Sequence, residues 1–276
     1  MSSVQPTLSL TPAAAAPPVA SDAPLEVGPP LPNRPIAWRD TARGLARLLS
    51  NPERTESVFE LMRAIGGRGS EPTFQAFRSI GGSGRLLHHA PDLIAALADR
   101  DSLARLPEGS LGRGYLAFAE RNHVSADGLI QARDNTGLRE LQPSLDPARA
   151  WFFDRLNPIH DLWHVLTGYE TDPVGEVGLL AFTIGQGCSD RTFKLLFAVA
   201  ILRGSWKDRF AFHRFLWRAW RSGRRAQPLL ALPYEELLRR PLEPRRDRLG
   251  IKRLALVHPH GVPAPVVSPQ AATGAA

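Results

Sequence analysis

The spacing of apolar residues predicts helices along almost the whole chain. From Trp38 onward, apolar positions recur every three to four residues far more often than they alternate, and strand signals are nearly absent. In the first half this pattern predicts helices near 42–49, 51–66, 73–80, 92–104 and 111–122. Asn51-Pro52-Glu53 supplies a cap, a first-turn proline and an early acid, so we expect the first two helices to form a hairpin.

The second half of the chain has the clearer pattern. It predicts helices at 151–167, 174–187, 192–202, 206–223 and, more briefly, 234–240. Gly168 is a natural residue to end the first of these, and Asp172-Pro173 a natural start for the next. The link between them is therefore short, and we expect the two helices to pack antiparallel. The predicted fold is all-α, a single multi-helix domain with antiparallel helix pairs.

Composition confines this domain to the middle of the chain. Residues 1–35 are mainly Pro, Ala, Ser and Val with hardly any aromatic content, which predicts a disordered tail because little apolar surface is available for burial. Residues 258–276 turn to Pro, Gly, Ala and Val and predict a second disordered tail. A helical domain at 36–257 remains.

Charge and cysteine content limit the chemistry. The net charge of +7 is carried mostly by arginine and favours anionic partners. With Cys188 as the one cysteine, an internal disulfide and a Cys-rich zinc site are excluded, which leaves histidine and carboxylate side chains as metal ligands. The sequence has no Gly-rich dinucleotide or phosphate-binding loop, which disfavours nucleotide-dependent chemistry.

The sequence also favours a location. The apolar segments 177–188 and 193–202 are shorter than the roughly 20 residues that cross a bilayer. The N-terminus resembles neither a secretory signal nor a mitochondrial presequence. We therefore expect a cytoplasmic protein of bacterial type.

The segment 157–176 carries the most specific chemistry. His160 and His164 are four residues apart on a predicted helix, so both imidazoles project from the same face. Glu176 lies about one turn into the next helix, which places it level with His164 in an antiparallel pair. Two histidines and one carboxylate are typical of a catalytic zinc site, since they leave a position for water or substrate. Asp161 points about 100° away from His160, so it reaches the metal only by distortion, or serves as an outer partner or proton carrier.

Two further observations bear on this site. Phe153 and Leu156 lie on the same face of the predicted helix as the two histidines. This predicts an apolar wall suited to a hydrophobic aromatic substrate. A histidine pair at this spacing also arises by chance, and a buried histidine bonded to an acid is common, so a metal-free alternative stays open.

The segment contains a His-Asp-x-x-His motif that is followed, after eleven further residues, by Glu. This pattern resembles the signature of the coenzyme Q (ubiquinone) biosynthesis protein 4 family. His160, Asp161, His164 and Glu176 match it position for position. Residues 106–112 with Tyr115 resemble the family's Leu-Pro-x-Gly-Thr-Leu-Gly-x-x-Tyr element, with Ser110 in place of Thr, and residues 248–251 resemble its close. The resemblance spans about 42–251, and Tyr234 stands where we expect Trp.

This resemblance implies a function. It implies an α-helical fold, often a homodimer, and a divalent metal usually taken as Zn²⁺, with Fe²⁺ or Mn²⁺ as alternatives, held by His160, Asp161, His164 and Glu176. It also implies metal-dependent oxidative decarboxylation, the loss of carboxyl and gain of hydroxyl at ring carbon 1 of a polyprenyl-hydroxybenzoate precursor, with His160 and Asp161 catalytic. A polyprenyl-binding groove, peripheral association with the cytoplasmic face of an anionic membrane, and other ubiquinone biosynthesis proteins as partners are implied too. In an alternative account such proteins are non-catalytic, lipid-binding scaffolds of the biosynthetic complex.

The predicted helix at 206–223 suggests how such a protein meets a membrane. It carries an aromatic stripe and, next to it, an arginine stripe: Trp206, Phe210, His213, Trp217 and Trp220; Arg214, Arg218, Arg221 and Arg225. Aromatic rings beside guanidinium groups are typical of a helix that rests on anionic lipid. A core-facing aromatic stripe with a solvated basic flank explains the pattern equally well.

Three other functional classes fit part of the sequence. A pI near 10.4 suits a nucleic-acid-binding module, but the histidine motif then has no purpose, so we expect no nucleic-acid partner. A metal-dependent hydrolase shares the histidine spacing, although an aspartate replaces the protease glutamate. A di-iron carboxylate protein is suggested by Glu120-x-x-His123 beside Asp161-x-x-His164, but we identify no further helices with inward-facing acids.

Overall fold

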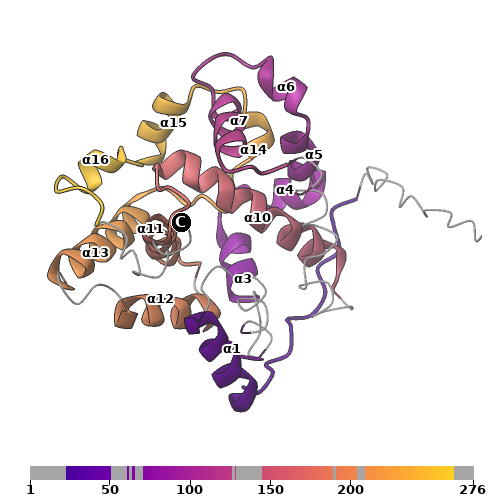
Figure 1. The fold of residues 1–276 in the computed structure, drawn as a ribbon. Helices are drawn as coiled ribbons and strands as arrows, with labels where there is room; N and C mark the ends of the chain where they lie inside the picture. The colour runs from indigo at the N-terminus through magenta and orange to yellow at the C-terminus, as the bar shows by residue number, and fades with distance from the viewer. Residues whose placement is uncertain are drawn as a thin grey trace, which may run out of the picture.

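The predicted all-α fold is confirmed by a computed structural model, which describes residues 23–50, 61, 64–65, 71–125, 128, 145–188, 191–203 and 209–263. Throughout these ranges the named elements are all helices (Figure 1). The helix that we predicted at 51–66, and its hairpin with the preceding helix, lie largely outside the described residues.

The helices follow one another along the chain in numerical order. In the first half they are α1 (Trp38–Ser50), α3 (Glu71–Ser79), α4 (Ser83–His89), α5 (Leu93–Ala98), α6 (Arg100–Ala104) and α7 (Leu111–Arg121). In the second half they are α10 (Pro147–Thr167), α11 (Pro173–Gly185), α12 (Arg191–Arg203), α13 (Arg209–Arg225), α14 (Tyr234–Leu237), α15 (Leu242–Leu249) and α16 (Leu254–Val257).

Helix α10 runs through the middle of the molecule and contacts α5, α7 and α11 (Figure 1). Its start is set by Asp146, whose carboxylate accepts a hydrogen bond from the backbone N–H of Arg149, and by Pro147 in the first turn. It ends at Gly168, which adopts the left-handed conformation (φ 81°) that favours glycine. The predicted helix end is therefore confirmed, and it fixes where the chain turns toward α11.

Helices α11 and α13 pack closely through glycines. A Cβ atom added at Gly185 would lie 2.3 Å from the carbonyl oxygen of Trp220, and one added at Gly223 would lie 2.2 Å from that of Phe182. The missing side chains thus let the two backbones approach each other. This contact holds α13 against the helix that carries Glu176.

Some element boundaries differ from the prediction. The helix expected at 92–104 is two helices, because the carboxylate of Asp99 accepts a hydrogen bond from the backbone N–H of Ser102 and so begins α6. Helices α4, α15 and α16 were not predicted. They have only four to eight residues, too few for an apolar period to show.

The N-terminal segment makes defined contacts where we expected a disordered tail up to residue 35. Its backbone groups bond to the core, since the N–H of Leu25 donates to the carbonyl oxygen of Leu87 at 3.1 Å and the carbonyl oxygen of Glu26 accepts from Ala148. Arg149 donates to the carbonyl oxygen of Gly28. Leu25, Val27 and Leu31 also pack against the core, so the segment is held by its backbone and by a few apolar side chains. Residues 1–22 lie outside the described residues.

The predicted C-terminal tail, residues 258–276, starts at a residue that belongs to the folded domain. His258 is 4% exposed and shares a 2.8 Å hydrogen bond with the hydroxyl of Tyr169. The helical domain therefore includes His258, which composition alone had assigned to the tail. Residues 264–276 lie outside the described residues.

A buried ion pair supports the start of α10. Arg149 is fully buried and donates to both carboxylate oxygens of Glu71, at 2.7 and 2.8 Å, and its guanidinium lies 4.7 Å from the ring centre of Phe74. This network joins α3, α10 and the N-terminal segment. In the described part of the chain, no helix has the length and apolar character needed to span a bilayer.

Candidate metal centre

His160 and His164 on α10 and Glu176 on α11 come together as the sequence predicted. His164 Nε2 lies 3.3 Å from one carboxylate oxygen of Glu176, and His160 Nε2 lies 3.6 Å from the other. One ligand atom from each residue falls within 4.8 Å of the other two. In the described part of the chain, this is the one group of three histidine, cysteine or acidic residues that has metal-binding proximity.

The link between α10 and α11 sets this arrangement. After Gly168 ends α10, the carboxylate of Asp172 accepts hydrogen bonds from the backbone N–H groups of Val174 and Gly175 and begins α11. Pro173 occupies the first turn, where its missing N–H costs nothing. Glu176 therefore falls in the first turn of α11, beside the last turns of α10.

His164 has the environment expected of a metal ligand. Its Nδ1–H donates to the backbone carbonyl oxygen of Tyr169 at 2.9 Å, so the lone pair is on Nε2. That Nε2 is buried and makes no hydrogen bond with any described residue. A buried, unpaired acceptor aimed at a carboxylate and a second imidazole fits a divalent cation between them.

His160 forms the exposed side of the centre. Its side chain is 46% exposed, and its ring meets that of His164 edge to face with centres 4.7 Å apart. Its Nδ1 lies 3.7 Å from the carboxylate of Asp161, whereas its Nε2 faces Glu176. Solvent or a substrate can therefore approach from the His160 side, while His164 is enclosed.

Asp161 stands outside the three-residue cluster. The structure brings together three of the four residues that match the motif, and Asp161 lies beside Nδ1 of His160 instead. This agrees with the 100° offset of neighbouring residues on a helix. It favours Asp161 as an outer partner that orients the imidazole.

The charges of the cluster shift two pKa values in opposite directions. Burial alone would lower the pKa of His160, but the carboxylates of Asp161 and Glu176 raise it to about 9. Burial alone would raise the pKa of Glu176, but the hydrogen bond and charge of the protonated His160 beside it lower the pKa to about 2. In the absence of a cation, the centre at neutral pH therefore holds a proton on His160 and an ionised Glu176.

Two aromatic residues of α7 extend the site. The ring of Phe118 stacks on His164 with centres 5.5 Å apart, so α7 supplies an apolar contact that we had expected from Phe153 and Leu156. The hydroxyl of Tyr115 is buried and makes no hydrogen bond with a described residue. Burial and the negative charge of Asp161 raise its pKa to about 12.

Sequence reasoning missed two contacts of His164. Phe118 lies on another helix, and the carbonyl oxygen of Tyr169 belongs to the backbone, so neither leaves a signal in the spacing of α10. Tyr115 was named only through its motif. The di-iron alternative is not supported, since Glu120 and His123 are exposed and outside the cluster.

Comparison with known proteins identifies a matching family. Residues 44–255 match the family described as coenzyme Q (ubiquinone) biosynthesis protein Coq4. The ubiquinone biosynthesis protein COQ4 homologs of Rattus norvegicus and Homo sapiens are both 30% identical to this chain, over 80% of it and 80% of their own length. The coq4 protein of Aspergillus flavus is 30% identical over 74% of this chain and 69% of its own.

A solved structure is similar in fold. It is a crystal structure of a Nostoc punctiforme protein named for ubiquinone biosynthesis, with a TM-score of 0.53 and 20% identity over 79% of this chain and 99% of that one. At this identity it supports the fold alone. The curated relatives above are named as mitochondrial proteins, which differs from the cytoplasmic setting that we expected.

Proposed function

Because the chain belongs to the coenzyme Q (ubiquinone) biosynthesis protein Coq4 family, we propose that it performs a metal-dependent step of ubiquinone biosynthesis. The proposed step is the loss of the carboxyl group and gain of a hydroxyl at ring carbon 1 of a polyprenyl-hydroxybenzoate precursor. One observation carries the proposal: the buried, unpaired Nε2 of His164 faces His160 and Glu176 at ligand distance.

We propose that His160, His164 and Glu176 hold one divalent ion. Their two imidazole nitrogens and one carboxylate form a three-ligand set that leaves a further position for substrate. Zn²⁺ suits this set, and Fe²⁺ or Mn²⁺ are alternatives because histidine and carboxylate bind them too. A bound ion would supply positive charge for the ring carboxylate or phenolate of the precursor.

The protein's own side chains would position the ring and manage protons. Asp161 lies beside Nδ1 of His160, where it orients that imidazole and can carry a proton. Phe118 covers His164 and keeps water from that edge of the site. The half-exposed faces of His160 and Glu176 would meet the substrate.

The proposed reaction requires an oxidant. Loss of carbon dioxide leaves the bonding electron pair on ring carbon 1, and replacing carboxyl with hydroxyl removes two electrons from the ring overall. Dioxygen is the class of co-substrate that accepts these two electrons, and in the balanced reaction the carboxylic acid, one dioxygen and one water give the phenol, carbon dioxide and hydrogen peroxide. With Zn²⁺, which has no redox chemistry, the electrons would pass directly from the electron-rich phenol.

Release of carbon dioxide from a carboxyl-labelled polyprenyl-hydroxybenzoate tests this proposal. The metal-loaded protein should release label, and His160→Ala should lose at least 99% of that rate, roughly the effect of removing a group that stabilises developing charge. His88→Ala is the matched control, since His88 is exposed on α4 and outside the cluster. Unchanged turnover in His160→Ala would refute the proposed role. A metal-loaded wild-type protein without turnover would favour the scaffold account.

A further inference from the structure

Helix α13 turns aromatic and basic side chains toward solvent. Its buried face consists of five small or apolar residues: Phe212, Phe215, Leu216, Ala219 and Gly223. Phe210 is 77% exposed and Trp217 is 50% exposed, on the opposite face. The core-facing explanation of the aromatic stripe is therefore wrong for these two residues. Trp206 lies outside the described residues.

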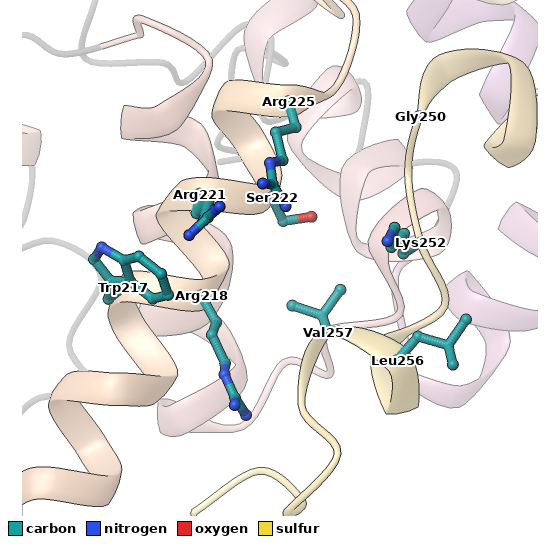
Figure 2. Close-up of a pocket in the computed structure, with 9 residues that line it drawn as sticks. All are labelled: Trp217, Arg218, Arg221, Ser222, Arg225, Gly250, Lys252, Leu256 and Val257. Carbon is teal, nitrogen blue, oxygen red and sulfur yellow. The ribbon is translucent and has the colours of Figure 1, made fainter.

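A groove with a volume of about 230 Å³ separates α13 from the chain around α16 (Figure 2). Arg218, Arg221 and Arg225 line it from α13, while Lys252 and Leu256 line it from the opposite wall. Figure 2 shows these two sets of side chains on facing segments, with Trp217 at one end of the arginine row. The groove therefore combines four cationic side chains with apolar rims.

The two walls are fixed relative to each other at both ends. The backbone N–H of Gln227, just after α13, donates to the carbonyl oxygen of Leu249 at 2.8 Å. After α16, the buried ring of His258 packs against Phe215 of α13, with centres 4.6 Å apart, and bonds to Tyr169. The groove is thus a feature of the fold and not a gap between loose segments.

The charges in the groove lack partners of opposite sign. The lining contains no acidic residue, and within the described ranges no carboxylate forms an ion pair with the four cations. The guanidinium of Arg221 lies 4.9 Å from the ring centre of Trp217, which holds it in the row. Four like charges around one groove are stabilised when an anion enters.

We propose that this groove binds the phosphate of an anionic phospholipid headgroup and so docks the protein on a bilayer. Phe210, Trp217 and Leu256, the last 70% exposed, would enter the headgroup region around the phosphate. These apolar rims favour a lipid, because a free phosphate or a nucleic-acid backbone gains nothing from an exposed leucine. The inference rests on the proposed function only in that a polyprenyl precursor resides in a membrane.

Flotation of the full-length protein with vesicles tests the groove directly. The vesicles contain equal parts of phosphatidylglycerol and phosphatidylcholine, with pure phosphatidylcholine vesicles for comparison. The triple variant Arg221→Gln, Arg225→Gln and Lys252→Gln should lower the partition coefficient about a hundredfold at low salt. All three side chains are exposed, so the variant should fold. A Trp217→Ser and Leu256→Ser variant should weaken binding at high salt as well, since the apolar contribution is not screened.

A charge-matched control separates the groove from net charge. Arg78→Gln, Arg105→Gln and Arg239→Gln remove the same charge from exposed positions in α3 and just after α6 and α14. This control should retain wild-type partitioning within about threefold, because its charges lie outside the groove. Equal losses in the two triple variants would overturn the proposal.

Two further results would also overturn it. One is saturable binding of inorganic phosphate without vesicle binding, which would make the groove a site for a soluble anion. The other is groove-dependent binding of a nucleic-acid duplex that exceeds vesicle binding. His160→Ala should float like the wild type, so a failed decarboxylation and a failed docking surface are distinguished.

Discussion

The Nδ1–H of His164 donates to the backbone carbonyl oxygen of Tyr169 at 2.9 Å. Tyr169 lies in the link between α10 and α11, so one short segment both orients the imidazole of His164 and brings Glu176 beside it. The tautomer that results leaves the Nε2 lone pair facing the cluster. The backbone conformation of this link therefore determines the geometry of two of the three candidate metal ligands.

Removal of Glu176 should abolish tight metal binding. We expect Glu176→Ala to lower the affinity for Zn²⁺ at least about a hundredfold, because it removes the only carboxylate of the cluster. Glu176 is 43% exposed, so the variant should stay folded. Zinc titration against a competing chelator measures this, with His88→Ala as control. Wild-type affinity in Glu176→Ala would mean that the three residues do not hold the ion.

Metal binding should release a proton at neutral pH. The pKa of His160 is raised to about 9, so its imidazole is protonated at pH 7 and must lose that proton to ligate a cation. Glu176, whose pKa is lowered to about 2, is already ionised. The apparent association constant should therefore rise about tenfold per pH unit from pH 7 and level off near 9. Calorimetry in buffers of different ionisation enthalpy measures the proton count, and no proton release would contradict this.

Much of the site could be predicted because its determinants are local. The spacing of His160 and His164 follows from helix geometry, and Gly168 and Asp172 mark the turn that sets Glu176. By contrast, the stacking of Phe118 and the burial of His258 arise from packing between segments distant in sequence. Spacing within one helix contains no information about such contacts.

The same distinction explains why the N-terminal segment was assigned to a tail. The segment 23–35 was expected to be disordered because it has little apolar surface, yet it is held by backbone hydrogen bonds and by Arg149, whose role depends on Glu71 from α3. Buried arginines are rare, so composition alone predicts that Arg149 is exposed. The prediction therefore failed where backbone hydrogen bonds, a buried arginine and a few packed apolar side chains such as Leu25 together hold the chain.

Arg149 should be essential to stability. We expect Arg149→Met to lower the free energy of unfolding by about 3–5 kcal/mol, because it leaves Glu71 buried at 2% exposure without its partner. The double variant Arg149→Met and Glu71→Leu should recover part of this loss, since no uncompensated charge remains. Chemical denaturation measures both. The matched control is Arg85→Met, whose exposed pair with Glu236 should contribute less than about 1 kcal/mol. Equal losses of unfolding free energy in the two single variants would show that the buried ion pair stabilises the fold no more than the exposed one.

His258 should make the folded protein less stable in acid. Burial, with a smaller effect of the charge on Arg218, lowers the pKa of His258 from 6.5 to about 4. Between these values the unfolded chain takes up a proton that the folded chain does not, so the free energy of unfolding falls as pH falls below 6.5, by up to about 3 kcal/mol. His258→Gln should remove this part of the slope. Denaturation of both proteins from pH 7 to 4 tests it, and parallel curves would contradict it.

The glycine contact between α11 and α13 should tolerate no methyl group. A Cβ at Gly185 would meet the carbonyl oxygen of Trp220 and the backbone of Arg224 and Gly223, so Gly185→Ala must push the helices apart, at a cost of roughly 1–3 kcal/mol. Gly84→Ala is the matched control, because nothing lies within 4 Å of its Cβ position and alanine favours the helix by up to about 1 kcal/mol. The two substitutions should therefore change the melting temperature in opposite directions. Since α13 also forms one wall of the basic groove, Gly185→Ala should weaken vesicle binding as well. If Gly185→Ala is as stable as the wild type, the close approach of the two helices is not needed.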